Sequence, residues 1–159
     1  MSRYRPVFAV LFAVFVVACG DSSTTTPDLG GSDPAVQIYA ASLGVNLSAM
    51  TKLSKALYIQ DIVAGTGAAA ASGQFIAVTY TGWLANGTQF DSNVGKDSLR
   101  FPLGAGAVIA GWDQGLVGMR VGGKRRLIIG SALAYGTQGH GVIPSNSTLV
   151  FDVQLLTAQ

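Results

Sequence analysis

The segment YTGWLANGTQFDSN, from Tyr80 to Asn93, carries the pattern that decides the fold. An Asn-Gly pair between two runs of β-forming residues is a strong signal for a β-hairpin, so Asn86-Gly87 is expected to turn one strand back along the other. Because side chains alternate between the two faces of a strand, Phe90 and Asp91 are predicted on opposite sides of the returning strand. A packed core accounts for Phe90 but not for the carboxylate beside it.

The rest of the chain continues the pattern of short strands bounded by Gly, Asn and Pro. Strands are predicted at Leu57–Val63, Phe75–Leu84, Gly87–Ser92, Leu99–Leu103, Lys124–Gly130 and Thr148–Leu156. One helix is expected over Ala110–Met119, where apolar residues recur at helical spacing and Asp113 suits the first turn. An antiparallel sheet closing over one short helix is an α+β arrangement.

Composition describes one globular domain of 159 residues, 49% of them apolar. The chain has one histidine, His140, one cysteine, Cys19, and no glutamate, which leaves little for a metal site and predicts no metal or other cofactor. Its glycines match neither a P-loop nor a dinucleotide fingerprint, and no serine lies in a nucleophile elbow. Hydrolytic and nucleotide-dependent enzymes are therefore disfavoured.

The first residues have the form of an export signal. MSRYRP is basic, and the twelve apolar residues of VFAVLFAVFVVA are too few for a spanning helix, which needs about 20. Residues 1–18 are therefore predicted to be a signal peptide, and VVAC resembles a bacterial lipoprotein signal in which Cys19 is lipidated. Ordinary secretion with an incidental cysteine is the alternative. The predicted location is the bacterial cell envelope, with the anchor in a membrane and the domain facing the periplasm or the cell exterior.

A polar tether and an ambiguous segment follow the signal. Residues 19–34 are rich in Ser, Thr, Gly and Pro and are predicted to be flexible. Residues 35–56 are read as an N-terminal extension of the domain, an ambiguous segment that could be a short helix followed by an edge strand. Once Arg3 and Arg5 are removed, eight basic residues face eight acidic ones, so the cations of GKRRL (123–127) are read as a solvated face rather than a nucleic-acid site.

Four motifs from Leu57 to Leu156 resemble the FKBP-type peptidyl-prolyl cis-trans isomerases, in the same order as in that family. They are VTYTGWLANGTQFDSN, FPLGAGAVIAGWDQGLVGMRVGGKRRLII, AYGTQGHGVIP and TLVFDVQLL. The resemblance implies a five- or six-stranded antiparallel sheet wrapped around one short helix, with the isomerase domain at 57–159. The chain resembles above all the short bacterial envelope members of this family, and it is expected to be a monomer. In the loops, Lys96 and Leu99 stand where relatives commonly place an arginine and an aromatic residue.

The resemblance also implies the site. The residues implied to be catalytic are Tyr80, Phe90, Asp91, Ile109, Trp112 and Tyr135, and those implied to bind substrate are Phe101, Val108, His140, Val142, Ile143 and Phe151. Taken singly, Tyr80, Phe101, Phe151 and Trp112 are better read as core, and His140 as an exposed loop residue.

Together these residues imply a dry aromatic pocket for the ring of a substrate proline. Trp112 is expected beneath the ring and Asp91 is expected to be a buried, hydrogen-bonded carboxylate. The implied partners are proline-containing polypeptides, with macrolide inhibitors as candidate ligands. A module that binds prolyl segments or another apolar ligand without catalysis, and a structural lipoprotein that uses the fold as a spacer, remain as alternatives.

Overall fold

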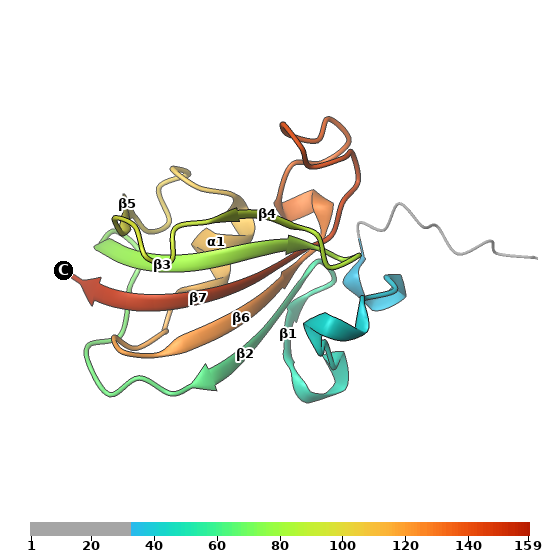
Figure 1. Ribbon diagram of the computed structural model, residues 1–159. Coiled ribbons are helices and arrows are strands. Elements are labelled where there is room, and N and C mark those ends of the chain that lie inside the picture. Colours follow the sequence, from blue (N-terminus) through green and yellow to red (C-terminus); the bar gives the residue numbers. More distant parts are fainter. Residues whose placement is uncertain (1–32) are drawn as a thin grey trace, which may run out of the picture.

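A computed structural model describes residues 33–159 as one antiparallel sheet that curves around one helix (Figure 1). The predicted signal peptide, Cys19 and nearly all of the predicted tether lie outside the described residues. The strands are β1 (Thr51–Ser54), β2 (Leu57–Val63), β3 (Phe75–Leu84), β4 (Gln89–Ser92), β5 (Leu99–Pro102), β6 (Lys124–Ile129) and β7 (Leu149–Ala158), and the helix is α1 (Ala110–Gly115). The α+β class and the antiparallel sheet around one short helix are confirmed, with seven strands because β1 joins the six that the sequence predicts.

The order of strands places β3 between β7 on one side and β4 and β5 on the other. The path runs β1-β2-β6-β7-β3-β4, and β5 pairs with the first half of β3 on the edge that β4 occupies further along. Both neighbours of β3 are antiparallel, with Tyr80 opposite Val153 of β7 and Gly82 opposite Asp91 of β4. This long strand therefore carries its inward side chains to the place where β4, β7 and α1 meet.

The main core lies between α1 and the concave face of the sheet. Leu127 of β6 and Leu155 of β7 point inward, are at most 1% exposed and pack with Leu116 and Met119, which follow α1. Strand alternation explains this selection, because residues two apart point to the same face. A helix of six residues is not stable by itself, so burial of apolar area against the sheet stabilises α1.

The helix ends at Gly115, four residues earlier than predicted, and a buried arginine binds the carbonyl of this last residue. Arg125 of β6 points inward and is 5% exposed. Its Nη1 donates to the carbonyls of Gly115 and Val117 at 2.9 and 3.2 Å, and its other nitrogens bind Asp61 at 2.7 and 3.0 Å. A cation at the C-terminal end of a helix is favourable. The sequence predicted that the cations of GKRRL (123–127) form a solvated face, and this prediction was wrong for the buried Arg125.

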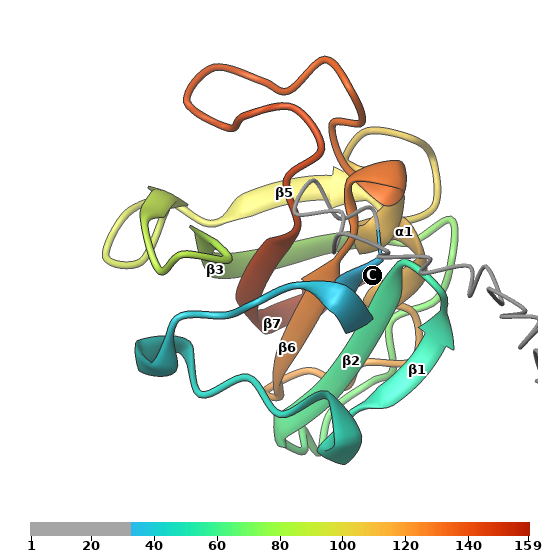
Figure 2. The same ribbon diagram turned by 90° about the vertical axis from the view of Figure 1, so that its right-hand side faces the viewer.

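The segment before β1 forms a second, smaller cluster on the outer face of the sheet. Three 3₁₀ turns, η1 (Pro34–Val36), η2 (Ala41–Leu43) and η3 (Leu47–Ala49), replace the short helix weighed for this region, and the edge strand is β1. Figure 2 shows this segment lying across the near side of β2 and β6. Leu43 packs there with outward residues of the sheet, of which Trp83 is partly buried. No helix formed by residues 33–159 is long and apolar enough to cross a membrane.

One arginine ties this outer segment to the sheet. Arg126 donates to the carbonyl of Leu43 at 2.6 Å and to both carboxylate oxygens of Asp152 at 2.7 and 3.0 Å. Asp152 is also 3.6 Å from the ammonium of Lys124. Arg126 and Lys124 therefore stabilise the outer face of the sheet.

Candidate functional site: an aromatic pocket between the sheet and the helix

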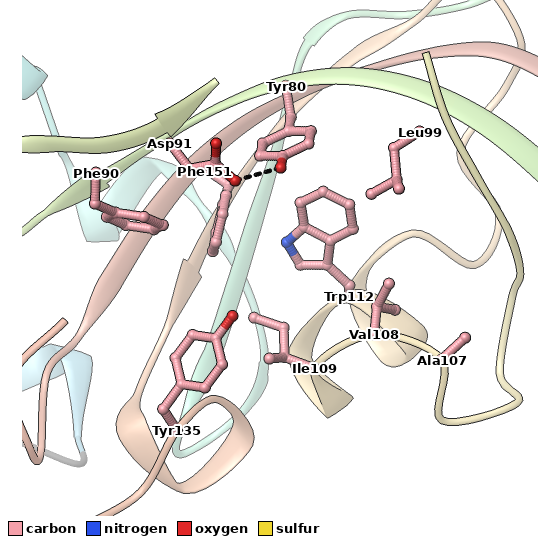
Figure 3. A pocket seen from close by; sticks show the side chains of 10 residues that line it. All are labelled: Tyr80, Phe90, Asp91, Leu99, Ala107, Val108, Ile109, Trp112, Tyr135 and Phe151. Atoms are coloured by element: carbon pink, nitrogen blue, oxygen red, sulfur yellow. Dashed lines mark hydrogen bonds between the residues drawn. The ribbon is translucent and has the colours of Figure 1, made fainter. Parts of the chain in front are cut away.

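A pocket of about 190 Å³ opens where β3, β4 and β7 meet the start of α1 (Figure 3). Ten residues line it: Tyr80, Phe90, Asp91, Leu99, Ala107, Val108, Ile109, Trp112, Tyr135 and Phe151. Eight of them belong to the twelve residues implied by the resemblance to bind or act on substrate. None of the ten is a serine, cysteine, lysine or histidine.

Trp112 forms the floor of the pocket. It is 4% exposed and lies in the first turn of α1, which places the indole across the inward side chains of β3 and β7. The rings of Tyr80 and Phe151 meet it edge to face, with centroids 5.0 and 5.2 Å away and interplanar angles of 83°. This arrangement suits the quadrupoles of aromatic rings and holds each ring in place.

Phe90 and Asp91 both line the pocket, which the alternation rule does not allow for a regular strand. The pairing shifts between Gly82 and Trp83: Gly82 faces Asp91 but Trp83 faces Gln89, so Phe90 is an extra residue in β4. Such a β-bulge re-aims a side chain. The prediction that Phe90 and Asp91 lie on opposite sides of the strand was therefore wrong. The bulge brings both side chains to the pocket.

The hairpin before this bulge has three loop residues rather than two. Leu84 accepts a hydrogen bond from the N–H of Gly87 and donates to the carbonyl of Thr88, and Gly87 has a φ of 89°. This is a turn closed by a left-handed glycine, the common form of a three-residue hairpin loop. Strand β4 consequently begins at Gln89, two residues later than predicted.

Asp91 is exposed at the rim of the pocket, so the expectation of a buried carboxylate was wrong. Its charge is nevertheless hydrogen-bonded, because the hydroxyl of Tyr80 donates to Oδ2 at 2.5 Å. Burial raises the pKa of Tyr80 above its ordinary value, and the hydrogen bond to Asp91 raises it further. Burial and the charge of Asp91 likewise raise the pKa of Tyr135. Both phenols therefore remain hydrogen-bond donors well above neutral pH.

The loop that leads into α1 is held by Asp113. Its two carboxylate oxygens accept the N–H groups of Gly104 and Gly106, each at 2.8 Å. Both glycines have a φ above 70°, which other residues rarely adopt. The loop is thereby fixed so that Ile109 caps α1, and no acceptor among residues 33–159 takes the N–H of Ile109.

A second hollow adjoins the pocket beneath the loop 139–143. Phe90, Asp91 and Tyr135 line it from the pocket side, and His140, Gly141, Val142 and Ile143 line it from the loop. His140 stacks on Tyr135, with ring centroids 4.9 Å apart and an interplanar angle of 12°. Val142 is 75% exposed, so this loop offers an apolar surface beside the main pocket.

His140, Val142 and Ile143 line the adjoining hollow and not the main pocket, and two further differences separate the structural pocket from the implied one. Phe101 is 4% exposed and lies behind Trp112, 5.8 Å between ring centroids, so it supports the floor instead of lining the pocket. Leu99 and Ala107 line it although they were not among the implied site residues. The loop position of Ala107 carries no sequence signal that would have identified it. Within residues 33–159, no group of three or more His, Cys, Asp or Glu side chains is placed to hold a metal.

Comparison with known proteins identifies the family of this chain. A family model described as FKBP-type peptidyl-prolyl cis-trans isomerase matches residues 67–156. The chain belongs to this family. The FK506-binding protein of Neisseria meningitidis serogroup A is 51% identical over 102 residues, which are 63% of this chain and 94% of that protein. The FK506-binding protein 4 of Rhizopus delemar is 50% identical over 109 residues, but these span only 28% of its length.

Solved structures of FKBP-type proteins agree with the fold. FkpA from Escherichia coli has a TM-score of 0.64 and 41% identity over 70% of this chain and 52% of that one. AtFKBP13 has a TM-score of 0.60 and 41% identity over 65% of this chain and 93% of that one. The enzyme class expected from the sequence, an FKBP-type peptidyl-prolyl cis-trans isomerase, is thereby confirmed at the level of the family. The outer segment 33–56 lies before the part that the family model matches.

Proposed function

We propose that this domain accelerates rotation about X-Pro bonds by desolvation, without a covalent intermediate. The observation that carries this proposal is a pocket whose floor and walls are aromatic or aliphatic and whose polar groups are hydrogen-bond donors and one carboxylate. The X-Pro bond turns slowly because amide resonance makes the planar state stable. The planar imide is more polar than the twisted one, so a dry pocket disfavours the planar form relative to the twisted form.

The polar groups then have the task of positioning the peptide. In this proposal the free N–H of Ile109 and the hydroxyl of Tyr135 bind substrate carbonyls on either side of the prolyl ring. Asp91 holds the hydroxyl of Tyr80 and so fixes the ring that meets Trp112 edge on. The adjoining hollow under the loop 139–143 extends the surface available to the residues that flank the proline.

The test is the rate of cis-trans exchange in a proline tetrapeptide whose trans form alone is cleaved by an added protease. The chain is expected to accelerate the slow phase in proportion to its concentration. Phe90→Ala and Trp112→Ala should each lower kcat/KM by at least about tenfold, since each removes a wall or the floor of the pocket. Phe75→Ala is a matched control, because Phe75 is 59% exposed at the start of β3 and lines no part of the pocket.

The same assay, together with a measurement of peptide binding by calorimetry, separates the alternatives. Tight binding of the peptide without acceleration would favour a non-catalytic prolyl-binding module, and neither binding nor acceleration would favour a structural spacer. FK506, for which several relatives are named, is expected to compete for the pocket. Because Leu99 lines the pocket where relatives commonly have an aromatic residue, the affinity for macrolides is a separate measurement from activity.

We also propose that the domain works in the bacterial cell envelope, held to a membrane by a lipid on Cys19 and acting on exported proteins that contain proline. The support is the sequence of residues 1–34, in which a basic start, twelve apolar residues, VVAC and a polar tether follow one another. The mature chain should partition with membranes and Cys19→Ser should release it. Intact mass measured on protein from its native host would refute the anchor by finding Cys19 unmodified.

A further inference from the structure

Asp91 brings a negative charge to the mouth of the pocket. Among the ten residues of 33–159 that line the main pocket, it is the one charged side chain, and it is exposed. The hydroxyl of Tyr80 donates to its Oδ2, and within residues 33–159 its Oδ1 accepts no hydrogen bond. Figure 3 accordingly shows one of the two carboxylate oxygens engaged by Tyr80. A carboxylate offers about four acceptor positions, so most of the acceptor capacity of Asp91 is open to a ligand.

The charge of Asp91 is not compensated as the charges of other aspartates in this sheet are. Asp61 binds two nitrogens of Arg125 at 2.7 and 3.0 Å, and Asp152 binds two nitrogens of Arg126 at the same two distances. No ion pair formed within residues 33–159 includes Asp91. A cation would therefore find a carboxylate at the pocket that no arginine or lysine already occupies.

Asp91 also stands where three hollows meet. It lines the main pocket, the hollow under the loop 139–143, and a third hollow bounded by Ser92, Val94 and Lys96. Within the part of the chain that the structure describes, Lys96 is the only lysine or arginine that lines any of them, and its ammonium donates to the carbonyl of Ser92 at 3.3 Å. A polypeptide whose proline occupies the main pocket continues into the adjoining hollows, so a residue next to the proline passes Asp91.

We propose that Asp91 selects substrate segments that carry a lysine or an arginine next to the proline. The cationic group binds the open carboxylate oxygen, which makes a charge-assisted hydrogen bond. The aromatic walls exclude part of the water, so this pair is stronger than one between two side chains in free solution. A glutamate at the same substrate position is repelled. This inference rests on the proposed isomerase function and names the class of prolyl segment that the site favours.

The test uses peptides that differ in one charge. Acetylated and amidated prolyl peptides carry lysine, glutamine or glutamate directly before the proline in one series and directly after it in a second series. Exchange spectroscopy by NMR gives kcat/KM of the full chain for each peptide. At about 0.01 M salt the lysine peptide should exceed the glutamate peptide by about tenfold in at least one series, with glutamine between them. At about 1 M salt, where charges are screened beyond about 3 Å, this ratio should fall to about threefold or less.

Three variants separate the charge of Asp91 from its other contacts. Asp91→Asn removes the charge but keeps an oxygen that can accept from Tyr80, so the ratio of the lysine to the glutamate peptide should fall to about one, whatever happens to the overall rate. Lys96→Gln removes the nearby cation and should raise the ratio by about twofold. Asp97→Asn is the matched control: it removes the same charge from the same loop, but Asp97 lines none of the three hollows, so the ratio should not change.

Two results would overturn the inference. One is equal kcat/KM for the lysine and glutamate peptides in both series with the unsubstituted chain, since the carboxylate would then not select charge. The other is a preference for lysine that persists in Asp91→Asn, since a different group would be responsible. If the chain does not accelerate even the glutamine peptides, it is the proposed isomerase function that fails, and the inference falls with it.

Discussion

Gly82 of the YTGWL strand offers the sharpest test of how the pocket is built. A Cβ at this position would lie 2.7 and 2.9 Å from two atoms of the Phe90 ring and 2.8 Å from the Phe151 ring. Ordinary contact begins at about 3.4 Å, so the Phe90 ring must retreat by about 0.7 Å. The two rings stand edge to face with centroids 5.5 Å apart, and the missing Cβ is what lets both approach β3. Gly82→Ala should therefore drive the walls into the space meant for the proline ring.

The expected magnitudes follow from packing. Overfilling a packed site costs about 1–3 kcal/mol, and replacing glycine by alanine in an extended strand returns about 0.4–1 kcal/mol by restricting the unfolded chain. The free energy of unfolding should thus fall by about 1–2 kcal/mol, measured by urea denaturation. In the protease-coupled assay kcat/KM should fall by at least about tenfold, or roughly 1.4 kcal/mol in the barrier.

Gly115→Ala serves as the control for stability. Its Cβ would meet the side chain of Leu127 between α1 and the sheet, away from the pocket, so stability should fall while kcat/KM per folded molecule is kept. A Gly82→Ala protein with full activity would refute the argument, because the walls would then not define the site. Equal loss of activity in both variants would also refute it, since stability and not pocket shape would be responsible.

Three further expectations follow from the site and one from the fold. Tyr80→Phe and Asp91→Ala should each lower kcat/KM severalfold in the peptide assay, and the double variant should be no worse than either single one, because both remove the same hydrogen bond. The rate on a neutral peptide should be nearly flat from about pH 6 to 9, and His140→Ala should change it by less than about tenfold; a bell-shaped profile that disappears in this variant would show proton transfer instead. The raised pKa values of Tyr80 and Tyr135 contribute stability that is present below their ordinary value of about 10 and is lost as the pH rises through the folded values, so urea titrations should show a decline above pH 10 that is smaller in Tyr80→Phe. Leu43→Ala should destabilise the chain by about 2–4 kcal/mol by calorimetry without changing kcat/KM, because this 7%-exposed side chain anchors the outer segment far from the pocket.

The sequence by itself determined the elements and the residue types of the site. Periodicity predicted β2 and β3 with the bounds that the structure shows, and it predicted α1 from its first residue. These features are local: alternation, turn residues and helical spacing are properties of a few consecutive positions. Motif resemblance then brought together Tyr80, Trp112 and Phe151, whose contact spans more than seventy residues of chain.

Tertiary structure decided what depends on neighbours in space. The bulge that turns Phe90 and Asp91 to the same side arises from pairing with β3, which alternation within β4 cannot reveal. The helix stops at Gly115, whose carbonyl binds Arg125 of strand β6, and β1 forms because β2 offers it an edge. Asp91 lies at an exposed rim and Phe101 behind the floor because depth in a pocket is set by the packing of distant elements. The same packing buried the Trp112 N–H without a hydrogen-bond partner, and only the folded chain shows this.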